Sequence, residues 1–481
     1  MTRIVVGPFN RVEGDLEVRL DVAGGRVREA YVNSPLYRGF EQILRGREPA
    51  DALVVVPRIC GICSVAQSRA AALALAQAAN VTPPANAFLV ANLLLGAENL
   101  ADHFMHFYLF FMPDFAQSLY ADAPWYERIQ ARFAALRGTA AREVMAIRAD
   151  LLHVAGILGG KWPHTLGLQP SGVTRAVGAA ELLRLRAALS RFRHYLEERT
   201  FGCALSAFAD FDPDALDAGH APGAPDADLA HFLHVARELR LEDLGRGPGR
   251  YMSYGAYADA GGPLFAAGVW DGAPAPLDVS QITEDTSHGW FSDGAGPLHP
   301  AEGVTDPDVD RPGGYSFVKA PRLAGRPCEV GPLARQLISG QSLIHALVLR
   351  AGSNVLSRIL ARFAEMAIVV QAMEGWIEAI DPDAPFCGPP VTYPQEVRAA
   401  GLIEAARGSL GHWLQIHDGR IANYQIIAPT TWNFAPRDRE GVPGPLEQAL
   451  VGAPVQTGER QPIAVAHIVR SFDPCMVCTV H

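Results

Sequence analysis

Apolar residues repeat with two different periods along this chain, and each period predicts one kind of secondary structure. Residues 16–22 alternate between apolar and polar, Gly24 and Gly25 interrupt them, and a second apolar-rich run covers residues 27–32. This arrangement predicts a β-hairpin near the start of the chain. A second hairpin is predicted over residues 412–426, around an Asp-Gly turn.

A period of 3.6 residues marks the segments that are predicted to be helical. With approximate ends, these segments are residues 41–45, 63–80, 85–112, 139–158, 178–199, 226–240 and 340–378. Pro83 and Pro84 follow the second of them and Pro113 follows the third, because proline cannot continue a helix. Residues 205–335 are rich in Asp, Pro and Gly, so long ordered loops with short strands are predicted there.

Together these patterns predict a fold that is mainly α with peripheral β-hairpins, of the α+β class. No internal repeat or low-complexity tract divides the chain, so we expect one compact domain over residues 1–481. Its expected parts are an N-terminal hairpin region at about 3–35, a helical core at about 60–200 and 335–380, the loop-rich segment at about 205–335, and a C-terminal hairpin and tail at about 400–481.

The composition is that of a globular protein with an apolar interior. Apolar residues make up 49% of the chain and charged residues 19%, and the net charge of −10 argues against nucleic acid or an anionic membrane as the partner. The most apolar stretch, residues 85–112, contains Glu98 and Asp102, so it is predicted to be a buried helix and not a membrane span. The N-terminus has no apolar signal segment, and from this we expect a cytoplasmic protein.

Two Cys-x-x-Cys pairs lie at opposite ends of the chain: Cys60 with Cys63, and Cys475 with Cys478. Two thiols three residues apart can face one metal ion, so four thiolates at one point would suit zinc, an iron–sulfur cluster or another late transition metal. From the pairs alone, a structural zinc site is the more common use. The other cysteines are most simply small buried apolar residues: Cys203, Cys328 and Cys387.

Eight segments, in order along the chain, form a pattern that goes beyond the cysteines. They are residues 11–14 (RVEG), 38–41 (RGFE), 58–63 (RICGIC), 102–108 (DHFMHFY), 315–322 with 329–335 (YSFVKAPR and EVGPLAR), 406–413 (ARGSLGHW), 429–438 (PTTWNFAPRD) and 473–481 (DPCMVCTVH). The set resembles the large, catalytic subunits of nickel–iron hydrogenases over residues 3–481. Zinc modules are usually compact, so widely separated pairs together with the other segments disfavour zinc.

The resemblance implies that all four cysteines bind nickel as thiolates. Cys60 and Cys475 would be terminal on nickel, whereas Cys63 and Cys478 would also bridge to an iron that carries carbon monoxide and cyanide. It further implies that dihydrogen is cleaved heterolytically, with the proton taken by Cys475.

The resemblance gives Glu13 the role of the first proton relay after Cys475. A carboxylic acid suits that step because burial can raise its pKa toward that of a thiol. A solvated carboxylate at the end of a strand is the alternative reading. Asp15 stands where the family more often has His, which leaves the following step of the proton path open.

Four polar residues resemble the family's surroundings of the iron. Arg407 would hydrogen-bond a cyanide, since a fixed guanidinium with forked donors suits a small anion. Thr430 is the candidate donor to the second cyanide. Asp102 and Asp473 resemble the acids that hold the guanidinium, although capping of a helix is an alternative role for Asp473.

A second metal is implied near the C-terminus, as magnesium or iron. Glu41, the backbone carbonyl of Ile426 and His481 resemble its protein ligands. A hard, hydrated ion fits a carboxylate and a carbonyl oxygen, although His is an unusual ligand for magnesium.

Three departures from the common family pattern indicate its regulatory, hydrogen-sensing branch and the related cytoplasmic uptake enzymes. Gln67 stands where many relatives have His, and Ile62 and Phe110 stand where oxygen-sensitive enzymes carry the smaller Val and Leu. At the inner end of a gas channel, larger side chains would hinder dioxygen more than dihydrogen. Plain core packing is the alternative explanation for both.

The resemblance also implies partners. The three cysteines outside the pairs are not expected to bind an iron–sulfur cluster, so a small subunit that carries such clusters would take the electrons across a large interface. His164 is a candidate for that face. The regulatory branch adds a sensor histidine kinase and a dimer of heterodimers. The alternatives are an energy-conserving uptake hydrogenase and, from another class, a structural zinc or redox scaffold. Such large subunits can be exported on the small subunit's signal.

Overall fold

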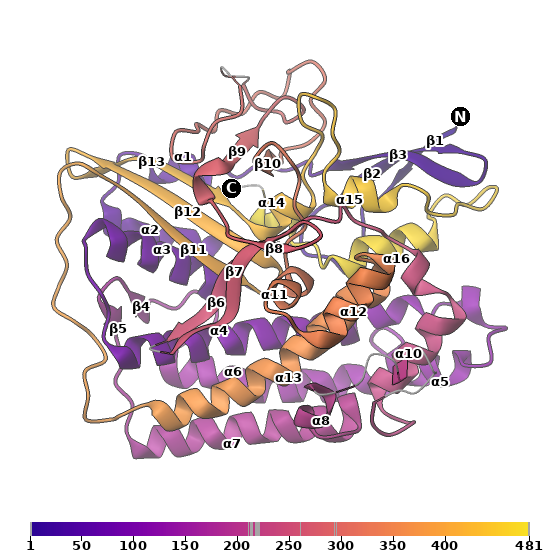
Figure 1. The fold of residues 1–481 in the computed structure, drawn as a ribbon, viewed down its shortest axis with the longest axis horizontal. Coiled ribbons are helices and arrows are strands. Elements are labelled where there is room, and N and C mark those ends of the chain that lie inside the picture. Colours follow the sequence, from indigo (N-terminus) through magenta and orange to yellow (C-terminus); the bar gives the residue numbers. More distant parts are fainter. Residues whose placement is uncertain are drawn as a thin grey trace.

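Long helices lie along one side of the molecule and the sheets lie along the other (Figure 1). This computed structural model describes residues 2–209, 211, 215–216, 222–259, 261–292, 294 and 296–479. The long helices are α4 (Ala85–Met105), α6 (Thr139–Gly159), α7 (Ala179–Tyr195) and α13 (Val355–Ala379). Helix α4 is buried on every side from Ala97 to Met105, so its polar residues there face other protein groups and not solvent.

Shorter helices surround these four and connect the sheets. They are α1 (Phe40–Leu44), α2 (Ala52–Val55), α3 (Ser64–Ala78), α5 (Tyr126–Phe133), α8 (Leu205–Ala209), α10 (Asp228–Glu238), α11 (Pro332–Ile338), α12 (Ser342–Ala351), α14 (Pro429–Asn433), α15 (Pro445–Leu450) and α16 (Ile463–Ser471). The sequence therefore predicted the α+β class correctly.

Two predicted helices differ from the structure in how they end. The helix expected over residues 85–112 stops its regular winding at Met105 and continues as a wider π-helical turn, η3 (His106–Phe111). Pro113 follows that turn and has no N–H group to extend the ladder. The helix expected over residues 340–378 is two helices, α12 and α13.

The break between α12 and α13 has a local cause. Gly352 ends α12 with φ at +70°, a positive value that glycine adopts without a steric penalty. Asn354 then begins α13, because its side chain accepts the N–H of Ser357 at 2.9 Å and the Ser357 hydroxyl accepts the N–H of Asn354 in return.

Both predicted hairpins gain a third strand. The N-terminal sheet pairs β1 (Thr2–Val6), β2 (Glu17–Ala23) and β3 (Arg26–Asn33) antiparallel. The C-terminal sheet pairs β11 (Val397–Ala405), β12 (Gly408–His417) and β13 (Arg420–Ile427) in the same way. β1 is separated from β2 by the loop of residues 7–16, so no short turn marked it in the sequence. β11 joins β12 through Ala406 and Arg407, and this pair contains no glycine or asparagine to mark a tight turn.

The segment expected to hold only short strands contains a long hairpin. Strands β6 (Tyr251–Asp259) and β7 (Gly262–Trp270) have nine residues each and are joined to the short β8 (Pro274–Ala275). Two further pairs are short: β4 (Leu168–Gln169) with β5 (Gly172–Val173), and β9 (Ile282–Asp285) with β10 (Ala320–Leu323).

The first and last parts of the chain lie side by side. Figure 1 shows the indigo strand β3 close to the yellow helix α15, and the N–H of Val32 donates to Glu447 at 3.0 Å. The backbone of Val27 also exchanges hydrogen bonds with Gly452 and Ala453. This pairing brings residues from both ends into one interior. Among the described residues, no helix is both long and apolar enough to cross a membrane.

Candidate metal centre

Four thiols from the two ends of the chain meet in the interior. The Sγ atoms of Cys60 and Cys475 are 3.5 Å apart, those of Cys63 and Cys478 are 3.0 Å apart, and those of Cys475 and Cys478 are 2.9 Å apart. All four atoms lie within 4.8 Å of one another, and all four residues are buried as free cysteines. The predicted convergence of the two Cys-x-x-Cys pairs is therefore confirmed.

The local structure aims these thiols at one point. Cys60 adopts an extended conformation after the 3₁₀ turn η2 (Val56–Ile59), and Cys63 is the first residue before helix α3. Cys475 precedes the 3₁₀ turn η9 (Met476–Cys478), which turns Cys478 back toward it. A tight turn after the first cysteine of a pair lets the second thiol face the same side.

The electrostatics of the cluster fit a cation. Contacts with the other thiols and Arg407 hold the pKa of Cys60 below its usual range, while burial raises the pKa of Cys475. Mutual contacts also raise the pKa of Cys63 and of Cys478, because four neighbouring negative charges would repel one another. A bound transition metal would remove that conflict, since soft thiolates are its preferred ligands.

Glu13 lies directly against the second cysteine pair. Its backbone pairs with Cys475: Glu13 N–H donates to the carbonyl of Pro474 at 3.3 Å, and Met476 N–H donates to the carbonyl of Glu13 at 2.7 Å. Gly14 permits this approach, because a Cβ there would lie 2.9 Å from the backbone N of Val477. Burial, followed by the charge of Cys60, raises the pKa of the half-buried Glu13.

Arg407 is held by the two predicted acids. Its Nη2 lies 2.8 Å from Asp102 and 3.1 Å from Asp473, and its Nε donates to the carbonyl of Asp473 at 2.9 Å. Its Nη1 is buried and has no hydrogen-bond partner among the residues that the structure describes. An orphaned guanidinium nitrogen is costly unless a further acceptor is bound there.

The surroundings shift the pKa values of the two acids in opposite directions. Burial raises the pKa of Asp102 well above its usual value. Burial would also raise that of Asp473, but Arg407 and His106 more than offset it and hold the pKa of Asp473 at about 2. Asp473 makes no side-chain cap to η9, so its contact with Arg407 is the role that the geometry supports. Thr430 accepts the N–H of Cys475 at 3.2 Å, which leaves its hydroxyl hydrogen free to donate.

Two of the residues predicted to form the second site, Glu41 and Ile426, lie in direct contact. Glu41 accepts the N–H of Ile426 at 2.8 Å and the hydroxyl of Thr305, and Lys319 lies 3.7 Å from the same carboxylate. His481, the third predicted ligand, lies outside the described residues. Lys319 was not singled out from the sequence, although it lies within one of the matching segments.

The three residues that indicated the regulatory branch, of which Ile62 and Phe110 suggested a gas filter, lie in different surroundings. Gln67 is buried and its Oε1 accepts from Nε2 of His412 at 2.8 Å, while Nδ1 of His412 lies 2.8 Å from the hydroxyl of Tyr424. Ile62 is half-buried between the first two cysteines. Phe110 is half-buried in η3, next to the polar cluster described below.

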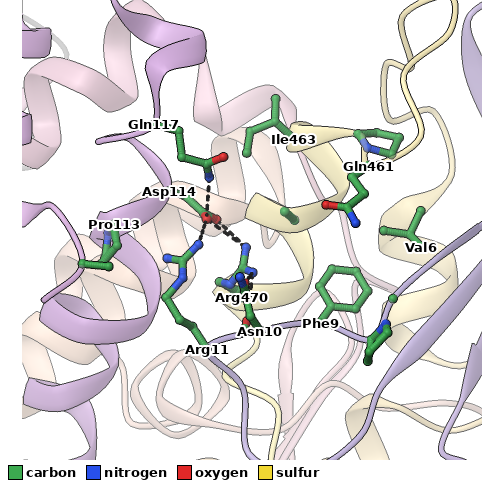
Figure 2. Close-up of a pocket in the computed structure, with 15 residues that line it drawn as sticks. Val6, Phe9, Asn10, Arg11, Pro113, Asp114, Gln117, Gln461, Ile463 and Arg470 are labelled. Atoms are coloured by element: carbon green, nitrogen blue, oxygen red, sulfur yellow. Dashed lines mark hydrogen bonds and ion pairs between the residues drawn. The ribbon is translucent and has the colours of Figure 1, made fainter.

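Asp114 is a buried carboxylate that was not singled out from the sequence. It holds the segment that leads to Glu13. Asp114 accepts two hydrogen bonds from Arg470, at 2.7 and 2.9 Å, and a further one from Arg11. Arg470 also donates to both oxygens of Asn10, at 2.9 and 2.7 Å. Figure 2 shows the side chains of Arg11, Arg470 and Gln117 pointing at Asp114, with Asn10 against Arg470. These residues line a cavity of about 420 Å³. The cluster ties residues 10–11 to the helix that leads to Cys475.

Comparison with known proteins agrees with this geometry. The family model described as nickel-dependent hydrogenase matches residues 38–135 and 141–481. The chain is 32% identical to the periplasmic NiFeSe hydrogenase large subunit of Desulfomicrobium baculatum and 30% identical to the uptake hydrogenase large subunit of Azotobacter chroococcum. Each match covers 100% of this chain and 95% of the relative.

One expectation from the sequence is corrected by these relatives. The chain was predicted to be cytoplasmic because its start has no apolar signal segment. The relative from Desulfomicrobium baculatum is a periplasmic protein, so the prediction of a cytoplasmic location is wrong. The missing apolar segment at the start of the chain was therefore not a reliable guide to location.

The fold is shared as well as the sequence. A solved structure of the NiFeSe hydrogenase from Desulfomicrobium baculatum superimposes with a TM-score of 0.86 at 30% identity, covering 100% of both chains. The four-thiol cluster fits the nickel–iron site of such an enzyme. The chain therefore belongs to the nickel-dependent hydrogenase family, as a catalytic large subunit.

Proposed function

We propose that this hydrogenase subunit splits dihydrogen heterolytically, with the thiolate of Cys475 taking the proton and Glu13 carrying it onward. The observation that carries this proposal is the backbone pairing of Glu13 with Cys475. Dihydrogen is a very weak acid, so its cleavage needs a Lewis acid next to a base. Glu13 suits the relay because its raised pKa brings it closer to that of a thiol.

The four thiolates would hold a nickel–iron centre, with Cys60 and Cys475 terminal on nickel and Cys63 and Cys478 also bridging to iron. When bound, such a centre supplies the Lewis acid that polarises dihydrogen. Arg407 would donate from its orphaned Nη1 to a cyanide on the iron, which also carries carbon monoxide, and Thr430 would donate to a second cyanide.

Asp102 and Asp473 fix the plane of Arg407, so its free nitrogen keeps one direction. A second metal, magnesium or iron, would be held by Glu41, the carbonyl of Ile426 and His481. The closeness of Glu41 to the backbone of Ile426 supports this site. The chain as a whole would act as one compact domain.

The relay is tested with Glu13→Gln, which keeps the shape of the side chain but cannot transfer a proton. We expect hydrogen–deuterium exchange between dihydrogen and solvent to fall at least about 100-fold, because a positioned acid–base group contributes about that factor. Nickel content, and the infrared bands of carbon monoxide and cyanide on iron, should be unchanged.

Two results would contradict the proposal. Exchange at the rate of the unaltered protein would remove Glu13 from the proton path. Zinc in place of nickel, with no carbonyl or cyanide bands in the unaltered protein, would instead favour a structural zinc scaffold. Glu17→Gln, a half-buried glutamate on β2 that pairs with Asn33, is the matched control and should leave exchange unaffected.

At the level of biology, the subunit would report hydrogen as a regulatory, oxygen-insensitive sensor. Ile62 and Phe110 support this role, because these larger side chains would narrow a gas channel at the metal site, and Gln67 supports it because many relatives have His there. Its partners would be a small subunit with iron–sulfur clusters and a sensor histidine kinase, in a dimer of heterodimers. An uptake hydrogenase that feeds electrons to respiration is the second candidate, favoured by the uptake relative from Azotobacter chroococcum.

A further inference from the structure

Helix α3 begins at a metal-binding cysteine and is capped from another helix. Cys63 occupies the N-cap position, and its side chain makes no cap to the helix. The free N–H groups of the first turn are satisfied instead by Glu98 of α4: Val65 N–H donates to one carboxylate oxygen at 2.9 Å, and Ala66 N–H donates to the other at 2.9 Å. These are the groups that a Ser or Asp at the N-cap would normally accept.

The same carboxylate joins the helix to the loop that lies over the first cysteine pair. Trp162 donates to it at 3.0 Å, and the hydroxyl of Ser64 does so at 3.4 Å. That hydroxyl accepts the N–H of His164 at 3.2 Å, and the His164 ring in turn lies 2.9 Å from the carbonyl of Pro57. A continuous set of hydrogen bonds therefore runs from the segment before Cys60 to the turn after Cys63.

The carboxylate of Glu98 accepts hydrogen bonds from every polar group that surrounds it. It is only 2% exposed, and every partner around it is a donor, so the ionised carboxylate is the form that the surroundings fit. Its negative charge lies at the positive end of the α3 dipole. Burial still raises the pKa of Glu98 to about 7, which shows how far from solvent the group lies.

We propose that Glu98 is the positioning residue for Cys63: it supplies the cap that a metal-ligating cysteine cannot supply, and so fixes the direction of the Cys63 thiolate toward Cys478. This inference rests on the proposed function, in which Cys63 binds the metals. A side chain at the N-cap cannot turn inward to cap the helix and outward to bind a metal at the same time. Because Glu98 on α4 caps helix α3, the side chain of Cys63 can face the metal.

The experiment compares Glu98→Leu and Glu98→Gln in the full chain with its maturation system. Leu fills the space but accepts no hydrogen bond, whereas Gln keeps one accepting oxygen and loses the charge. The matched controls are Glu447→Leu and Glu447→Gln. Glu447 is also fully buried and accepts one backbone N–H, from Val32 at 3.0 Å, and one aromatic donor, Tyr315 at 2.8 Å. The readouts are nickel per chain, the frequency of the iron carbonyl band, and amide exchange at Val65 and Ala66.

For Glu98→Leu we expect nickel loading to fall about 10- to 100-fold, the range found when a group that orients a metal ligand is removed. Amide exchange at Val65 and Ala66 should become at least about fivefold faster, the factor for one lost hydrogen bond. Glu98→Gln should keep nickel within about fivefold of the unaltered chain, because one acceptor remains, but displace the carbonyl band. Neither Glu447 variant should change nickel or band in the folded protein.

The outcomes separate this inference from the proposed function. If the unaltered chain held no nickel, the proposed function would fail, while amide exchange would still test the cap. Normal nickel and an unmoved band in Glu98→Leu would overturn the positioning role, as would equal losses in Glu447→Leu. If Glu98→Leu does not fold, the Gln variant decides: a displaced band at unchanged thermal stability supports the role, and an unmoved band contradicts it.

Discussion

At the scale of single residues, Asp114 is a buried carboxylate surrounded by basic side chains. It is fully buried and lies between two arginines and His467, whose Nδ1 is 3.3 Å from it. Burial would raise the pKa of Asp114, but His467, Arg470 and Arg11 hold it well below its usual value. The ionised group therefore joins Arg11, which is close in sequence to Glu13, to Arg470 on α16.

We predict that Asp114→Asn lowers the free energy of unfolding by about 3–5 kcal/mol at pH 7, the usual loss when one partner of a buried ion pair is removed. The pKa of Asp114 is lower in the folded than in the unfolded protein, so its contribution is complete above the unfolded value of about 4 and is lost as pH falls through the folded value. The gap between the two proteins in chemical denaturation should be constant from pH 7 to pH 5.

Below about pH 4 that gap should shrink, because the unfolded chain of the unaltered protein then takes up a proton at Asp114 that the folded protein does not bind. The exposed Asp122→Asn is the control and should change the free energy of unfolding by less than about 0.5 kcal/mol at either pH. A gap that stays constant down to pH 2 would show that the charge of Asp114 contributes nothing to stability.

Residue roles were predictable from the sequence only where a short motif carried them. The four cysteines, Glu13 and Arg407 each lie in such a motif, and the structure brings all of them into one region. Glu98 and Asp114 do not, because their partners are distant in sequence: Asp114 meets Arg470, which is 356 residues further on. A buried carboxylate of this kind cannot be distinguished from a solvated one until its donors are known.

At the scale of elements, one glycine sets how closely helix α3 lies on the C-terminal sheet. Gly401 is on β11, and a Cβ there would lie 1.9 Å from the carbonyl oxygen of Ala70 and 2.7 Å from the N of Ala74. Both contacts are to backbone, which cannot move aside without shifting the helix. Since α3 begins at Cys63, this close packing also fixes the position of Cys63 relative to the C-terminal sheet.

We predict that Gly401→Ala lowers the free energy of unfolding by about 3 kcal/mol, the upper part of the range for overpacking a well-filled core, and reduces nickel loading. Gly375→Ala is the matched control: it lies within helix α13, where a Cβ would meet nothing within 4 Å. That change should stabilise the protein by up to about 1 kcal/mol, as alanine does within a helix. Thermal unfolding of both variants would check the pair, and equal effects would contradict the close approach.

Elements were predicted best where periodicity was long and local signals were strong. Residues 139–158 and 178–199 match α6 and α7, apart from the π-helical end of the latter at η6 (Leu196–Phe201). The break between α12 and α13 was missed although Gly352 and Asn354 mark it, because the apolar period continues across both helices. Strands β6 and β7 were not predicted at their full length, because they lie in a segment rich in glycine and proline. The prediction there followed this composition and not the alternation of apolar and polar residues.

At the scale of the whole molecule, the sensor and uptake roles predict different behaviour. A sensor should oxidise hydrogen slowly, keep its activity in air, and be needed for hydrogen-dependent gene expression. An uptake enzyme should be fast and lose activity in air. Turnover before and after exposure to air, together with transcription in a deletion strain, would separate the two roles.

A double variant would test whether Ile62 and Phe110 hinder the entry of dioxygen. Ile62→Val combined with Phe110→Leu should make activity in air decay faster, because smaller side chains would admit dioxygen. Ile377→Val, a buried apolar change on α13, is the control and should leave air stability unaffected. Unchanged air stability in the double variant would assign both residues to plain core packing.

The meeting of the two cysteine pairs also has a consequence for how the protein is made. Cys60 and Cys475 are 415 residues apart in sequence. At a synthesis rate of about 5–20 residues per second, the second pair is therefore made about 20–80 seconds after the first. During that interval the nascent chain offers two unprotected thiols to any zinc or copper ion in the surroundings, both of which bind thiolates readily. Shielding of those thiols until the second pair has been synthesised would protect the site from the wrong metal.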